Sequence, residues 1–426
     1  MESARFGPLN PGVRMFLPWL CGAGLAAGQQ VDLWDLPPMR YSETEPTDAV
    51  AALARGLERG EIQAEGATGL EKLRFVLKVL NVPESSQTLV FSKTSKQISR
   101  IHPGNPRALY FSEEAYVGYV PGGAIEVIAQ DPVLGPVFYL VEAGGPTGLV
   151  FDRDTSDCFS CHGTTRTENV PGMLIRSVFP DRDGRPLLSL GSVTVTHETP
   201  IEERWGGYYV TGSSDHPHFG NSFFEEGGPT EPSSEDVDDL SERIDVAKYP
   251  RGTSDIVALA VLEHQVNLHN LMTAARVRYG RARYLSQAID PSSNPDEGQA
   301  GRIADTMASK IVDALLFRNE ADLGDGIEGD DAFQRDYGAR FPRTESGESL
   351  ADFKLYRRLF KNRCSCMIYS QAFRGMPATV SERTLARLRG ALSDGDDSIA
   401  PHLSGSEKQR IREILDETFP DWKEKG

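Results

Sequence analysis

The feature that most constrains this chain is the run Cys-Phe-Ser-Cys-His at residues 158–162. Two cysteines separated by two residues and followed directly by histidine form the attachment pattern of a c-type haem, in which both thiols bond to the porphyrin and the histidine binds the iron. The run therefore predicts one covalent haem c, held by Cys158 and Cys161, with His162 as the proximal iron ligand. A redox dithiol and half of a zinc site are the alternatives. A zinc site needs four ligands, and no second Cys-x-x-Cys run or close histidine pair stands near this one.

The N-terminus has the features of a secretory signal. Arg14 precedes a short apolar stretch, residues 15–28, which ends in small residues such as Ala26. This pattern predicts a cleaved signal peptide over residues 1–28 and export to the periplasm, where c-type haem is attached. An uncleaved membrane anchor is the alternative. No further apolar run approaches transmembrane length, so we expect no transmembrane segment in the mature chain.

Composition limits the partners of the chain. The 426 residues carry a formal net charge of −17, which argues against binding to nucleic acid or to anionic membranes and favours a basic redox partner protein. Hydrophobic residues make up 39% of the chain, enough to bury a large core. Apart from the 158–162 run and a cysteine in the signal peptide, only Cys364 and Cys366 remain, and we expect them to be buried thiols.

Apolar periodicity changes along the chain. It predicts amphipathic helices over 46–61, capped by Thr47, and over 67–81. Short β-rich runs follow, and the haem motif lies in the loop after them. The predicted strands lie within 88–142, 192–197 and 204–212, with a hairpin turn at 180–186.

The second half of the chain reads as mainly helical. An acidic linker or crossing loop over 225–245 precedes a long helix over 254–285, capped by Ser254. Further helices are predicted at 297–318, 350–362, 381–393 and 406–418. The predicted fold class is α+β, with a haem-bearing region of short strands and helices (29–224) followed by a mainly helical region (246–426).

The sixth iron ligand is the least determined part of the site. Met173 stands eleven residues after His162 and is the nearest soft donor, although a methionine there equally suits core packing. His218 in a polar loop, and His264 and His269 on the long helix, are the other candidates. His264 and His269 are five residues apart, so their side chains diverge and cannot hold one metal together.

Several blocks of sequence occur together with the motif, in the order SSQTLVFSKTS, PRALYFSEEAYVGYV, CFSCH, VPGMLIRSVFPD, ERWGGYYVTG and SDIVALAVLEHQ. As a set they resemble exported bacterial proteins described as cytochrome c domain-containing, over residues 40–395. The resemblance implies covalent haem at Cys158 and Cys161, with His162 as proximal ligand. It implies no particular reaction.

Two functions remain open from the sequence. The first is electron transfer through the haem. The second is a periplasmic haem enzyme, a peroxidase-like or other small-molecule oxidoreductase, with an open iron face. Its pocket would be built from groups such as His218, Glu263, His264 or His269, which are otherwise members of a buried polar network.

Overall fold

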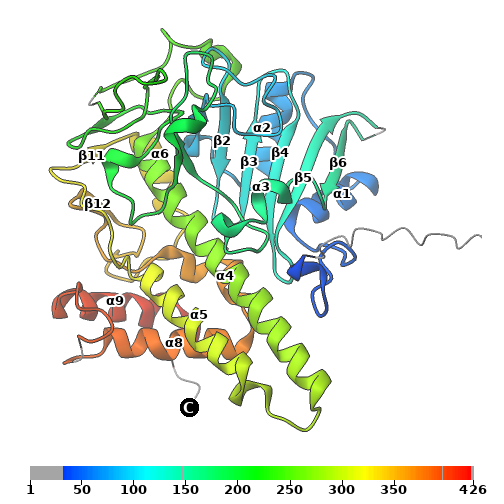
Figure 1. Ribbon diagram of the computed structural model, residues 1–426, viewed down its shortest axis with the longest axis vertical. Helices are drawn as coiled ribbons and strands as arrows, with labels where there is room; N and C mark the ends of the chain where they lie inside the picture. The colour runs from blue at the N-terminus through cyan, green and yellow to red at the C-terminus, as the bar shows by residue number, and fades with distance from the viewer. Residues whose placement is uncertain (1–31, 146, 234, 396, 424–426) are drawn as a thin grey trace, which may run out of the picture. The chain divides into compact units, whose positions relative to one another are not determined.

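The computed structural model describes residues 32–145, 147–233, 235–395 and 397–423. The expected signal peptide therefore lies outside the described residues. From Leu33 onward the chain forms one compact unit, in which the strand-rich and helix-rich regions share a core. A mixed α and β architecture is confirmed: an antiparallel sheet carries α1 and α2 on one face and the haem-motif loop with α4 on the other (Figure 1).

The sheet has seven strands in the order β6-β5-β4-β3-β2-β1-β9. Strands β1 to β6 form an antiparallel meander, and β9 returns from later in the chain to pair with β1. The meander positions the site because β6 leads directly into the haem motif. The strands are β1 (Thr88–Val90), β2 (Arg107–Phe111), β3 (Ala115–Tyr119), β4 (Ile125–Asp131), β5 (Gly135–Ala143), β6 (Leu149–Asp154) and β9 (Tyr208–Tyr209).

Both N-terminal helices are confirmed, as α1 (Ala49–Glu58) and α2 (Gly69–Val79). The cap of α1 is Asp48 rather than Thr47, and the other oxygen of the Asp48 carboxylate accepts a hydrogen bond from the Tyr139 hydroxyl on the sheet. Thr47 instead donates its backbone N–H and its hydroxyl to Asp131. The first turn of α1 is thus fastened to the face of the sheet opposite the haem motif.

The long helix α4 runs from Ile256 to Ile289, 34 residues, and is buried along most of its length. Its cap is Asp255, not Ser254, because the Asp255 carboxylate accepts from the backbone of Ala258. Ser254 joins the helix to the sheet: its hydroxyl accepts from the Leu89 N–H and donates to the Tyr209 carbonyl. The helix start is therefore fixed to strands β1 and β9.

Helices α5, α8 and α9 pack in a layer beyond α4, with α5 lying between α4 and α8 (Figure 1). The helix expected at 350–362 is wrong: the chain forms a hairpin there instead. The loop over 225–245 contains no described helix or strand. The elements of this half are α5 (Gln299–Leu315), α6 (Asp331–Gly338), β12 (Phe353–Tyr356), β13 (Arg358–Phe360), α7 (Gln371–Arg374), α8 (Ala378–Leu392) and α9 (Gly405–Thr418).

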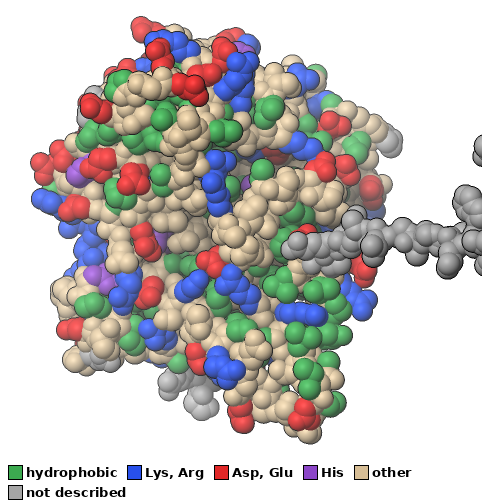
Figure 2. All heavy atoms as spheres, viewed as in Figure 1, with side chains coloured by type: hydrophobic (Ala, Val, Ile, Leu, Met, Phe, Trp, Pro, Cys, Tyr) green, Lys and Arg blue, Asp and Glu red, His purple; other side chains and the backbone are tan. Residues whose placement is uncertain are grey.

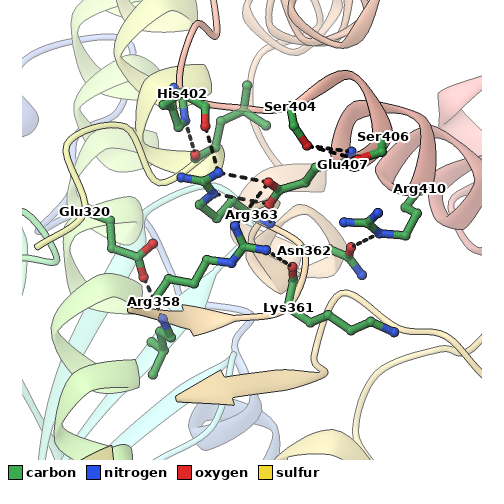
Figure 3. A network of polar contacts seen from close by, with 12 residues as sticks. Glu320, Arg358, Lys361, Asn362, Arg363, His402, Ser404, Ser406, Glu407 and Arg410 are labelled. Atoms are coloured by element: carbon green, nitrogen blue, oxygen red, sulfur yellow. Dashed lines mark hydrogen bonds and ion pairs between the residues drawn. The ribbon is translucent and has the colours of Figure 1, made fainter. Parts of the chain in front are cut away.

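A polar network ties α9 to the hairpin (Figure 3). The carboxylate of Glu407, in the first turn of α9, accepts from the guanidinium groups of Arg363 at 2.9 Å and Arg358 at 3.2 Å. Arg363 also donates to the carbonyl of His402. Glu407 is almost fully buried. Burial raises its pKa, but the two arginines lower the pKa by more than burial raises it, so the carboxylate stays ionised.

The surface carries both signs of charge. On the face shown in Figure 2, acidic and basic side chains are interspersed, and hydrophobic side chains gather over the far end of α4. Tyr284, Leu285 and Ile289 are the exposed apolar residues of that end. No helix among the described residues combines the length and apolar composition that crossing a membrane requires.

Candidate haem-attachment site

The haem motif forms a single helical turn, α3 (Phe159–His162), directly after β6. Asp154, the last residue of β6, accepts hydrogen bonds from the backbone of Ser156 at 3.0 Å and of Cys158 at 3.2 Å. Lys96 joins Asp154 and Asp157 at 3.1 and 2.9 Å. Burial raises the pKa of Asp154, but these hydrogen bonds outweigh burial and lower the pKa to about 2. The carboxylate before the turn is therefore ionised.

Phe159, between the two cysteines, anchors the turn. Its ring packs against Trp34, Tyr41 and Phe138, with centroid distances of 5.4, 5.2 and 5.4 Å. Gly163, just after the turn, lies so close to Trp34 that a Cβ there would come within 2.6 Å of the indole. The aromatic cluster therefore fixes the position of α3 on the sheet.

The two thiols of the motif are free, with Cys158 half-buried and Cys161 exposed. Burial, with a contribution from the Asp154 carboxylate, raises the pKa of the Cys158 thiol to about 12. Disulfide exchange requires a thiolate, so this environment disfavours a redox dithiol. Within the described ranges, no group of three or more His, Cys, Asp or Glu side chains is arranged to hold a metal ion. The two further ligands that a zinc site at these cysteines would need are therefore not in place among those residues.

His162 is oriented by two hydrogen bonds to Gly172. The ring Nδ1 lies 2.8 Å from the Gly172 carbonyl, and the Gly172 N–H donates to the His162 carbonyl at 2.8 Å. A carbonyl can only accept, so Nδ1 carries the proton and Nε2 carries the lone pair. Burial lowers the pKa of His162, which favours the neutral ring. An imidazole with a fixed Nδ1–H and a free Nε2 is the form that binds a metal.

Helix α4 holds the loop that orients His162. Asn270 accepts from the Met173 N–H at 2.9 Å and donates to the Met173 carbonyl at 2.8 Å. Gly172 lies directly against it, since a Cβ there would be 2.5 Å from Asn270 Oδ1. The sequence did not predict a role for Asn270 or Gly172. Asn270 stands 97 residues from Met173, and no local pattern distinguishes either residue.

Met173 itself is a buried core residue. Its side chain is 3% exposed, and its Sδ lies 3.9 Å from the Gln130 amide nitrogen. Its backbone follows Gly172 and therefore lies beside Nδ1 of His162, whereas Nε2 is the atom that would hold an iron. This arrangement argues against Met173 as the sixth ligand.

The sheet next to the motif offers an apolar surface. The ring of His162 packs on Phe138 with a centroid distance of 5.2 Å. Leu109, Ile128 and Leu140 share that face by strand register and are only half-buried, although they lie in central strands. Half-exposed apolar side chains beside free thiols fit a site that a porphyrin would cover.

A polar pair lies on the same face. Arg107 and Glu126 form an ion pair, and both act on the charge of His162. Gly118 separates them across the sheet, and a Cβ there would come within 2.6 Å of the guanidinium. The hollow left by this glycine is therefore filled by the Arg107 side chain.

Two of the remaining histidines named from the sequence, His218 and His264, belong to one connected buried network. His264 Nδ1 lies 3.3 Å from His197 Nδ1, and Arg204 donates to the His197 carbonyl at 3.1 Å. Trp205 donates to Glu263 at 2.7 Å and packs edge-on against His218, with ring centroids 5.0 Å apart. The other oxygen of Glu263 accepts from Arg204 at 2.8 Å. Burial lowers the pKa of His218 to about 4.

His264 and His269 point into different surroundings. His264 stacks on Phe317 at 3.9 Å and contacts Ser365 at 2.7 Å. His269 Nδ1 lies 2.7 Å from the Tyr116 hydroxyl. Among the described residues, no hydrogen bond or ring contact joins either histidine, or His218, to His162. The structure therefore joins His218, Glu263 and His264 in one buried network, and within the described part of the chain that network has no such contact with the haem motif.

No protein-family model, no curated protein and no solved structure matches this chain. The chemistry of the site must therefore follow from its own residues and their geometry.

Proposed function

We propose that this chain is an exported mono-haem c-type cytochrome that transfers electrons. Cys158 and Cys161 would hold the porphyrin, and His162 would bind the iron through Nε2. The observation that supports this most directly is the hydrogen bond from His162 Nδ1 to the Gly172 carbonyl at 2.8 Å, in the same turn as two free thiols. It leaves the correct nitrogen free in the correct tautomer.

The residues around the motif have defined tasks in this proposal. The bound haem supplies reversible one-electron chemistry at its iron. The Gly172 carbonyl orients the His162 ring and strengthens it as a donor. Phe138 and Phe159 exclude water from the buried side of the ring, and the Lys96 bridge to Asp154 and Asp157 fixes the start of the turn.

A second candidate is a small-molecule oxidoreductase, in which the bound haem would have an open iron face. Met173 lies in the core beside Nδ1, and His218, His264 and His269 are buried in contacts elsewhere. Among the described residues, no hydrogen bond or ring contact joins any of these predicted ligands to the His162 ring, and this supports a haem whose sixth position would be open. The two candidates differ in an observable way, because an open site binds carbon monoxide in the ferrous state and a closed low-spin site binds it poorly.

Location and partner follow from the same proposal. Covalent haem attachment takes place outside the cytoplasm, so the working location is the periplasm. The net charge of −17 suits a basic redox partner, whose association would weaken as salt screens the attraction.

The proposal is tested by producing the full chain together with a cytochrome c maturation system. Haem should remain with the polypeptide on a denaturing gel and resist acid–acetone extraction. The double variant Cys158→Ala/Cys161→Ala should lose this haem. The matched double variant Cys364→Ala/Cys366→Ala removes the two buried thiols and should keep it. Release of free haem from the unaltered chain, or equal loss in both variants, would contradict the proposal.

A further inference from the structure

A cavity of about 640 Å³ lies at one end of the sheet. It is bounded by the start of α2, the loop at 93–105, the β3–β4 turn and the facing ends of β5 and β6. This size falls within the usual range of small-molecule sites, roughly 300–1,000 Å³. The cavity is therefore large enough for a ligand of its own.

The lining of the cavity is apolar on one side. Ile125, Val141 and Leu149 line it from three strands, and the strand register places all three on the face of the sheet that carries α1 and α2. Such a lining holds the body of an organic ligand by burial of apolar surface.

Three hydrogen-bond donors line the same cavity without protein acceptors. They are the Lys72 ammonium, the Arg100 guanidinium and the Tyr119 hydroxyl, and within the described part of the chain none has a side-chain hydrogen bond or ion pair. Arg100 runs along the β3–β4 turn: its Cδ would lie 3.3 Å from a Cβ at Gly123. The Tyr119 hydroxyl lies at the first turn of α2, 3.3 Å from a Cβ placed on Gly69.

The acidic groups near the cavity either form ion pairs with Lys96 or are exposed to solvent. Lys96 also lines it, but Asp154 and Asp157 neutralise that ammonium. Of the described residues that line the cavity, Glu142 is the only acidic one, and it is exposed. The cavity thus presents two cations, the half-buried Lys72 and the exposed Arg100, against one exposed carboxylate, in a chain whose net charge is −17.

We infer that this cavity binds a small organic carboxylate. The carboxylate would accept from Arg100, Lys72 and the Tyr119 hydroxyl, while the apolar body lies against Ile125 and its neighbours. Because Asp157 directly precedes Cys158, the Lys96 bridge connects the rim of this site to the haem motif. The site itself consists of protein groups alone, so it does not depend on the haem proposal.

The test measures binding of phenylacetate by calorimetry, with the uncharged phenylacetamide and inorganic phosphate as comparisons. Both the haem-loaded protein and the Cys158→Ala/Cys161→Ala variant are used, and both should bind phenylacetate saturably. Arg100→Gln and Lys72→Gln should each weaken binding about tenfold or more, since charge-assisted hydrogen bonds are lost. Tyr119→Phe should weaken it less. Lys78→Gln alters an exposed lysine of the same helix that lies outside the cavity, and it should bind like the unaltered chain.

Three results would overturn the inference. Equal binding of phenylacetamide would show that the carboxylate is not recognised. Binding of phosphate without phenylacetate would show that the apolar wall is not used. An equal loss in Lys78→Gln would show general charge attraction instead of a site. Absence of covalent haem from the unaltered chain, with phenylacetate binding retained, would count against the proposed function and leave this inference intact.

Discussion

Replacement of Asn270 by alanine tests the contact through which α4 positions the Gly172–Met173 segment that orients His162. The change removes both hydrogen bonds between Asn270 and the Met173 backbone, at 2.9 and 2.8 Å. It leaves a buried N–H and a buried carbonyl without partners, and each such group costs about 1–3 kcal/mol. Alanine returns at most about 0.7 kcal/mol of helix propensity. We therefore expect the free energy of unfolding to fall by about 1–5 kcal/mol.

Urea unfolding of the haem-free protein measures this loss, and Asn267→Ala is the matched control. Asn267 lies one turn earlier on α4, is half-buried, and has no side-chain hydrogen bond in the described residues. The control gains the same helix propensity, so its stability should change by less than about 0.5 kcal/mol. In Asn270→Ala, the Nδ1 proton of His162 should also exchange faster with solvent, because Gly172 is no longer fixed. Equal stabilities of the two variants, with an unchanged Nδ1 proton, would refute the reasoning.

Three further predictions concern single residues. Met173→Leu conserves volume and should cost less than about 1.5 kcal/mol while leaving the haem spectrum unchanged; a change of spin state would show that Met173 binds the iron after all. Gly163→Ala should cost about 1–3 kcal/mol in thermal or urea unfolding, because its Cβ would lie 2.6 Å from Trp34, and unchanged stability would show that the indole can move away. Glu407→Gln should cost about 3 kcal/mol near neutral pH, since it breaks a buried ion pair. The folded pKa of Glu407 lies below its usual 4.5, so its stabilisation is present above pH 4.5 and is lost as pH falls; the variant should show a flatter stability profile below pH 5, and parallel profiles would contradict this sign.

Local patterns predicted local structure well. Helices α1 and α2 follow from apolar spacing, and only the cap of α1 is displaced by one residue, from Thr47 to Asp48. The same displacement occurs at the start of α4. Adjacent polar residues compete for the cap, and the sheet decides between them, since Thr47 binds Asp131 and Ser254 binds β1 and β9.

The hairpin at 353–360 shows where periodicity fails. Phe353, Tyr356 and Phe360 are spaced by three and four residues, as in a helix, yet they belong to two short strands. Leu355 and Arg357 have φ angles of 56° and 62°, which reverse the chain. Phe353 then stacks on Phe360, with ring centroids 5.0 Å apart. This turn depends on tertiary packing, so no local signal distinguishes it from a helix.

The candidate site also contains a part that the local sequence predicts and a part that depends on tertiary packing. The three motif residues could be predicted from the sequence because thioether attachment requires a fixed spacing. The groups that orient them come from distant segments: Gly172 and Asn270 are brought to His162 only by the packing of α4 on the sheet. The histidines on α4 and in the polar loop were candidates by residue type. His218 and His264 instead belong to a buried network around Glu263 and Arg204, and His269 bonds Tyr116.

The central claim is covalent haem attachment, and peptide mapping of the mature protein tests it most directly. Trypsin cleavage after Arg153 and Arg166 releases the peptide 154–166, which contains the whole motif. The account predicts that this peptide carries one porphyrin through both Cys158 and Cys161, and that neither thiol reacts with an alkylating reagent. Recovery of the peptide with two alkylated cysteines, from protein made with a working maturation system, would contradict it.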